Sequence, residues 1–161
     1  MTKILTTLLL TLWLSVGAAW AGDFEDGVAA HKKKDFVTAL KKFKSAAAQG
    51  NSDAQFNLGV MYDIGQGVTQ DYAEAVRWWK LAAAQGDATA QYNLGLMYGE
   101  GKGVVQDYTR AHMWFNLAAV TGDSVSVKNR DIVAKRMTPQ QISEAQKLAR
   151  ECQARSFKNC D

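Results

Sequence analysis

The sequence predicts an all-α protein built from stacked helical hairpins, and three observations support this fold class. Residues 54–62 return almost unchanged as residues 90–98, so the chain has a period of 36 residues. Glycine recurs at the same spacing, at Gly50, Gly86 and Gly122. The interior is rich in alanine and the chain has a single proline, which favours helices. A fixed period of about 20–50 residues is the signature of repeat units that pack on their neighbours.

Residues 1–21 are expected to be a secretory signal peptide. Lys3 is the only charged residue among them, and an apolar run at 8–14 precedes Ala19-Trp20-Ala21. We expect cleavage after Ala21, with cleavage after Ala19 as the alternative. An uncleaved membrane anchor is the competing interpretation, but the run is short for a spanning helix of about 20 residues. The mature protein is then periplasmic or secreted.

Composition narrows the classes of partner. Without residues 1–21, 140 residues remain, which is the length of one domain. Eighteen Lys and Arg face 16 Asp and Glu, a balance that argues against a nucleic-acid binder, which would show a clearly basic face. No second apolar run approaches membrane length, so we expect no membrane insertion after signal cleavage.

The two cysteines, Cys152 and Cys160, are predicted to form a disulfide. An exported chain meets an oxidising compartment, and an even pair this close in sequence is typical of a disulfide. The spacing is too wide for a zinc pair, which usually leaves about two to four residues between ligands. We expect no metal site and no cofactor.

Residues 51–86 and 87–122 each predict one helical hairpin. In the first of them Ala54, Leu58 and Tyr62 recur at helical spacing and face the second helix. The second helix is expected to begin at Asp71, an N-cap with Glu74 as its partner in a capping box. It is expected to end at a glycine, Gly86 and then Gly122 in the next unit.

The two ends of the array depart from this pattern. Residues 22–50 predict a degenerate N-terminal repeat whose turn is four residues shorter. Residues 123–161 predict C-terminal capping helices pinned by the disulfide. The first is expected to turn Val127, Ile132 and Val133 inward, and the second to start with a capping box at Thr138.

The two full units resemble the Sel1-like repeat family. The family pattern is a 36-residue helix pair with A-x-x-x-L-G-x-x-Y, a G-x-G-V turn and D-x-x-x-A-x-x-W-x-x-x-A-A-x-x-G. The matching residues are Ala54, Leu58, Gly59, Tyr62, Gly65, Gly67, Val68, Asp71, Ala75, Trp78, Ala82, Ala83 and Gly86. The next copy matches at Ala90, Leu94, Gly95, Tyr98, Gly101, Gly103, Val104, Asp107, Ala111, Trp114, Ala118, Ala119 and Gly122. The shortened first unit is more similar to the related tetratricopeptide repeat.

This resemblance implies a right-handed α/α superhelix that acts as an adaptor for protein contacts and has no catalytic residues to assign. In such superhelices the first helices line the concave side. The side chains that point away from the second helix are then the candidate partner-binding residues: Phe56, Asn57, Val60, Tyr92, Asn93 and Leu96. An amide beside an aromatic ring suits an extended peptide. The alternative is that the aromatic rings pack between units and the asparagines serve the fold.

Other patterns carry weaker signals. The glycines at 99, 101 and 103 fit a turn, because no strand precedes them and no Lys-Ser/Thr follows as a phosphate loop requires. His31 and His112 stand apart from any nucleophile arrangement, and His112 is expected at a helix surface between repeats. The basic run Lys32-Lys33-Lys34 is typical of a solvated face, with docking of an acidic partner as the alternative.

The predicted function is therefore an exported adaptor that binds a protein or peptide partner, with no enzymatic activity. Two other classes stay open. Some Sel1-like proteins are linked to β-lactam compounds, which would imply an envelope hydrolase, although this chain lacks their dense cysteine pairing. A purely structural, secretion-associated module is the third reading.

Overall fold

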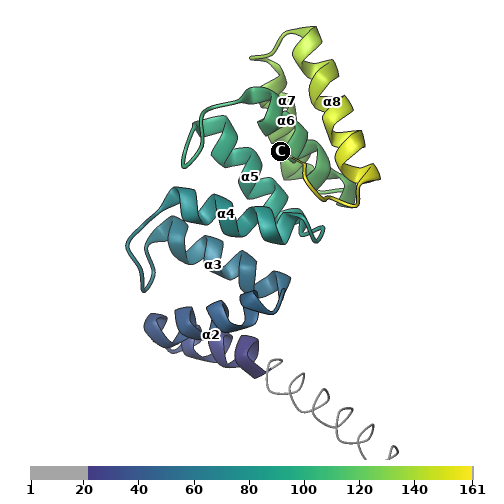
Figure 1. Cartoon of the computed structure of the whole chain (residues 1–161). Helices are drawn as coiled ribbons and strands as arrows, with labels where there is room; N and C mark the ends of the chain where they lie inside the picture. Colours follow the sequence, from purple (N-terminus) through teal and green to yellow (C-terminus); the bar gives the residue numbers. More distant parts are fainter. Residues whose placement is uncertain (1–21, 161) are drawn as a thin grey trace, which may run out of the picture.

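The computed structural model describes residues 22–160 as a stack of helices, so the predicted signal peptide lies outside the described residues. A helix over residues 22–32 comes first. The succeeding helices rise in chain order (Figure 1): α2 (Phe36–Ala48), α3 (Ser52–Ile64), α4 (Tyr72–Ala83), α5 (Ala88–Glu100), α6 (Tyr108–Ala118), the short 3-10 helix η1 (Ala119–Thr121), α7 (Ser124–Ala134) and α8 (Pro139–Ala154). Helices α3 and α4 form one hairpin and α5 and α6 the next, while α2–α3 and α4–α5 contacts join neighbouring units.

Each hairpin closes with an aromatic ring lying on a glycine. The Phe115 ring of α6 covers Gly95 of α5 so closely that an added Cβ would lie 2.6 Å from it. The indole of Trp79 covers Gly59 in the same way, and both rings are 2% exposed. The glycine in each first helix is therefore required for close helix packing.

The turns inside the hairpins connect one unit to the preceding unit. Gly103 has a φ of +68° and lies against the backbone of Tyr72, at the start of the preceding unit's second helix. Gly67, with a φ of +70°, lies against Phe36 in the equivalent way. A side chain at either position would meet strained backbone and a neighbouring main chain, so these turns fix the spacing between units.

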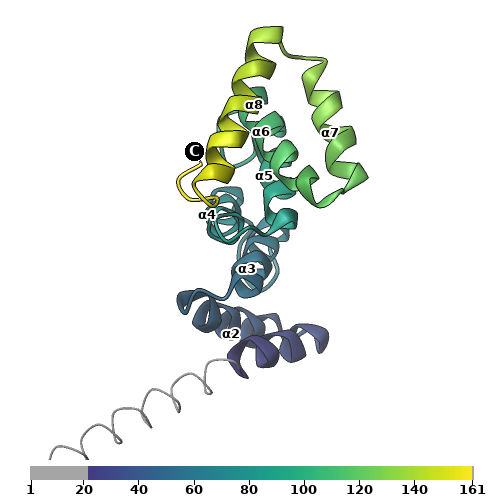
Figure 2. The ribbon, with the colours of Figure 1, turned by 90° about the vertical axis from the view of Figure 1, so that its right-hand side faces the viewer.

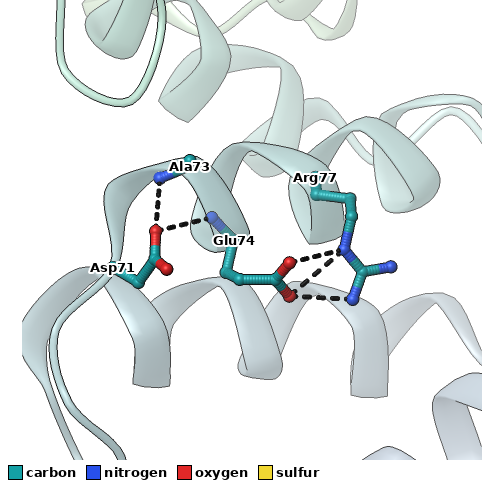
Figure 3. A network of polar contacts seen from close by, with 4 residues as sticks. All are labelled: Asp71, Ala73, Glu74 and Arg77. Carbon is teal, nitrogen blue, oxygen red and sulfur yellow. Dashed lines mark hydrogen bonds and ion pairs between the residues drawn. The ribbon is translucent and has the colours of Figure 1, made fainter.

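Two of the helix N-caps predicted from the sequence are present, whereas one predicted capping contact is absent. Asp71 caps α4 by accepting from the backbone N–H groups of Ala73 and Glu74 (Figure 3). The predicted capping box is wrong there, because the Glu74 carboxylate instead pairs with Arg77 at 2.8 Å. An Arg one turn away offers a bidentate partner, which a backbone N–H does not. At α8 the predicted box at Thr138 is present in both directions.

The C-terminal helices pack on the last hairpin from two sides. Helix α6 contacts both α7 and α8, which lie on opposite sides of it in Figure 2. The predicted disulfide is present between Cys152 and Cys160, with 5.0 Å between their Cα atoms. It closes a loop that brings the Phe157 ring to Gly86. This tail therefore reaches back to the preceding hairpin.

Two sequence expectations about burial are wrong. Ile132 points outward and is 45% exposed, whereas its neighbour Val133 carries the inward contact. His112 is 3% exposed and not at a helix surface, because α7 packs over that part of α6. The two repeat tyrosines also differ: Tyr98 is 3% exposed, whereas Tyr62 is only half-buried.

The buried apolar residues form two clusters that follow the array. One joins α2 to α3 through Phe43, Leu58 and Met61, and the other runs from α4 to α8. No helix within residues 22–160 is both long and apolar enough to cross a membrane.

Candidate functional site

The candidate binding residues occupy one repeated face of the first helices. Phe56, Asn57 and Val60 on α3 return 36 residues later as Tyr92, Asn93 and Leu96 on α5, and all six are half-buried. We call these positions the first-helix row. Half-burial is the expected state of side chains that pack sideways on the scaffold and still present an edge to solvent.

The asparagines of the first-helix row do not tie the helices together. Asn57 donates from Nδ2 to the carbonyl oxygen of Asp53 in its own helix at 2.7 Å, which leaves its Oδ1 available. Within residues 22–160 the side-chain amide of Asn93 makes no hydrogen bond. Their amide groups are therefore accessible to a ligand that offers backbone N–H and C=O groups.

The aromatic members of the row are also part of the scaffold. The Tyr92 ring packs on Phe115 with 5.5 Å between centroids, and its hydroxyl accepts from Asn129 of α7 at 3.2 Å. Phe56 contributes its backbone carbonyl, which accepts from the Trp79 indole N–H at 3.3 Å. A ligand on this face would contact ring edges held rigidly by these neighbours.

Helix α7 continues the row, which the sequence reasoning missed. Asn129 lies 36 residues after Asn93, and Ile132 lies 36 residues after Leu96. Asn129 also donates to the carbonyl of Val125, the same within-helix bond that Asn57 makes to Asp53. The signal was present in the spacing, but the loss of the leucine-glycine pair at 130–131 concealed it.

Two cavities lie between α5 and α7. One, of about 330 Å³, is lined by Tyr92 and by Val125 and Ser126 of α7. The other, of about 250 Å³, is lined by Leu96, Asn129 and Ile132, with Arg136 also on its wall. Of the six predicted residues, Tyr92 and Leu96 are thus brought onto a groove, which we call the α5–α7 groove.

The basic segment of the first unit is a separate surface. Lys32, Lys33 and Lys34 are exposed at the turn that precedes α2. Lys42 is engaged with Asp23 at 2.7 Å and with Asp26 at 2.8 Å. The hydrogen bond from Lys42 holds the pKa of Asp23 below its usual value.

The histidines have structural surroundings. His31 makes a 2.9 Å hydrogen bond with the side chain of Gln66, in the turn of the next unit. Burial lowers the pKa of His112, and the nearby Arg130 lowers it further, while Asp131 opposes this effect. No cluster of three or more His, Cys, Asp or Glu side chains suited to a metal occurs in the described part of the chain.

The stacked hairpins define the class of helical-repeat solenoids, and sequence comparison defines the family. The Sel1 repeat model matches residues 22–51, 52–87 and 88–119. The chain belongs to the Sel1 repeat family. The match includes the shortened first unit. From its sequence alone, that unit is expected to be more similar to a tetratricopeptide repeat. A search of curated protein sequences found no match.

Two solved structures support the same fold. One is c5321, described as a protective antigen present in uropathogenic Escherichia coli strains and displaying an SLR fold. It is 31% identical with a TM-score of 0.80 and covers 88% of this chain. A Sel1 repeat protein from Oxalobacter formigenes is 34% identical with a TM-score of 0.61 over 64% of this chain. This chain spans 31% of the first structure and 42% of the second, so it is much shorter than both.

Proposed function

We propose that this Sel1-repeat module is an exported adaptor that binds an extended segment of another protein along its first-helix row. The observation that supports the proposal most is the repetition of the same amide and aliphatic side chains, half-buried, on α3 and α5. A ligand with a repeating backbone meets the same chemistry twice along such a face. Repeat arrays generally use their extended concave surfaces in this way.

Export is part of the same proposal. The Cys152–Cys160 disulfide is the supporting observation, because disulfides persist mainly in oxidising compartments. We expect the native protein to begin at Gly22 and to be found outside the cytoplasm. N-terminal sequencing of protein from the native host tests this expectation, and a retained Met1 would contradict it.

The binding proposal is tested with a double substitution that leaves the scaffold contacts in place. Asn57→Ala combined with Asn93→Ala removes both amides but none of the aromatic packing. The wild-type chain, immobilised, should capture a partner from envelope extract that the double variant fails to capture. Gln146→Ala with Gln153→Ala is the matched control, because these exposed amides lie on α8 away from the row.

The outcomes separate the function classes. Capture lost by the double variant, with unchanged melting temperature and retained capture by the α8 control, supports the adaptor. Equal capture by all three proteins contradicts the assignment of the row. A double variant that unfolds shows that the two asparagines belong to the scaffold, and a basic surface at Lys32–Lys34 is then the next candidate.

A further inference from the structure

We propose that α7 extends the binding face beyond α3 and α5, and that the α5–α7 groove selects extended segments that carry a large apolar side chain near an acidic one. This inference rests on the proposed adaptor function. It makes that function specific, because it names a class of ligand and the part of the binding face that recognises the ligand. It assigns a binding role to α7, a helix that sequence reasoning took as a cap.

The first step is the register of the amides. Asn57, Asn93 and Asn129 follow one another at intervals of 36 residues on α3, α5 and α7. Two of them, Asn57 and Asn129, make the same Nδ2 bond to the carbonyl four residues earlier, at 2.7 Å and 3.1 Å. Their side chains are therefore held alike, with Oδ1 as the acceptor for a peptide N–H.

The second step is the apolar cavity beside Leu96 and Ile132. Gly95 and Gly99 line its base together with the Phe115 ring, which packs directly on Gly95. Its volume of about 250 Å³ is below the roughly 300–1,000 Å³ typical of sites for whole small molecules. The cavity therefore suits one aliphatic or aromatic side chain of a longer ligand.

The third step is the charge at the rim. Arg136 lines the same cavity and donates to the Tyr108 hydroxyl at 3.0 Å, with the ring 5.7 Å from its guanidinium. Within residues 22–160 Arg136 has no carboxylate partner. The other charged residue of the lining, Glu100, is neutralised by Lys102 at 2.8 Å. The smaller cavity thus offers the oriented guanidinium of Arg136, which a ligand carboxylate complements.

The Tyr92–Asn129 hydrogen bond gives the groove two compartments. Tyr92 lines the larger cavity and Asn129 the smaller one, so the bond marks the boundary between them. A peptide whose backbone replaces this bond at Asn129 would place side chains on both sides of the tyrosine ring. The smaller compartment then receives the apolar side chain, and the acidic side chain reaches Arg136.

The test uses the mature full chain and a phage-displayed library of random 12-residue peptides. Enriched peptides should pair a large apolar residue with Asp or Glu. They are then synthesised with amidated C-termini, so that any carboxylate effect comes from a side chain, and titrated by calorimetry. Arg136→Gln and Asn129→Ala should each weaken binding at least tenfold, whereas Arg136→Lys should recover most of the Arg136 effect. Arg150→Gln, an exposed arginine on α8, should change nothing.

The outcomes distinguish this inference from the adaptor function on which it rests. If selected peptides lose binding with Asn57→Ala and Asn93→Ala but bind the Arg136 and Asn129 variants normally, the role of α7 is wrong and the adaptor function stands. If enriched peptides show no acidic preference, the role of Arg136 is wrong. If the library yields no binder, or if all variants bind equally, both the groove and the first-helix row are wrong.

Discussion

The repeat at residues 87–122 and the C-terminal segment at 123–160 begin alike and are stabilised differently. Helices α5 and α7 have equivalent N-caps, Asp87 and Asp123, with ψ angles of 107° and 112°. In α5 the inward positions hold Leu94 and Gly95, on which Phe115 packs. In α7 the equivalent positions are Arg130 and Asp131, and among the helices of residues 22–160 none packs on them as α6 packs on α5.

The outward positions show the opposite behaviour. Asn93 and Leu96 of α5 are matched by Asn129 and Ile132 of α7, so this face continues where the packing face has changed. A helix that served only to end the stack would have no physical need for this agreement. The two regions therefore differ in the ring-on-glycine contact that holds a hairpin together. They agree in the side chains that the first helix presents to solvent.

The largest expected effect is the loss of the ring that closes the repeat. Phe115→Ala removes a 2% exposed side chain from the α5–α6 interface and should lower the free energy of unfolding by about 3–5 kcal/mol. Ile132→Ala on α7 is the control and should change it by less than about 0.5 kcal/mol, since Ile132 is 45% exposed. Urea denaturation followed by circular dichroism measures both. Equal effects would mean that α7 packs like a regular first helix.

The second prediction concerns how the C-terminal segment is held. Replacing Cys152 and Cys160 together by serine should cost about 2–3 kcal/mol in the chain-entropy model of a closed loop. Because each unit of a repeat array contacts mainly its neighbours, the loss should be local. Hydrogen exchange should accelerate in α8 and leave the α3–α4 hairpin unchanged. Faster exchange throughout the chain would show that the tail stabilises the whole stack.

Local patterns in the sequence predicted the structural features that depend on short-range interactions. The 36-residue period predicted the hairpins, and Thr138-Pro139 predicted the start of α8. Burial of single side chains was harder, because it depends on which helix packs where. His112 is buried because α7 covers α6, and no residue near His112 in sequence indicates that contact.

The candidate site was predicted in part for the same reason. The residues of the first-helix row follow from the repeat, but the groove beside Leu96 exists only because α7 returns to that face. Glu74 illustrates a competition that a motif cannot resolve, since Arg77 offers its carboxylate a stronger partner than the N-cap backbone. In each case tertiary packing or a charged partner decided the outcome.

A third prediction sharpens the role of the glycines. Gly59→Ala places a methyl group against the Trp79 indole, and overpacking of this kind costs about 1–3 kcal/mol. Gly99→Ala is the matched control on α5, because its Cβ would lie 3.8 Å from Ala111, an ordinary contact. Alanine favours helix over glycine, so Gly99→Ala should be neutral or slightly stabilising. Thermal melts of the two variants measure the difference, and destabilisation by both would contradict a specific ring-on-glycine contact.

The smallest expected effect lies at the boundary between the two regions, where His112 of α6 is covered by α7. Burial and the neighbouring Arg130 hold the pKa of His112 below its ordinary 6.5, with Asp131 opposing. The unfolded chain therefore takes up a proton before the folded chain does as the pH falls below 6.5. The contribution of neutral His112 to the free energy of unfolding should be present above that pH and be lost below it. The loss should be at most about 1.4 kcal/mol between pH 7.5 and 5.5. The variant His112→Gln should lack this part of the decline. Urea denaturation of both proteins at both pH values measures the difference, because the contributions of the other titrating groups cancel in the comparison. If wild type and variant lose the same stability, α7 does not desolvate His112, and the close packing of α7 on α6 is wrong.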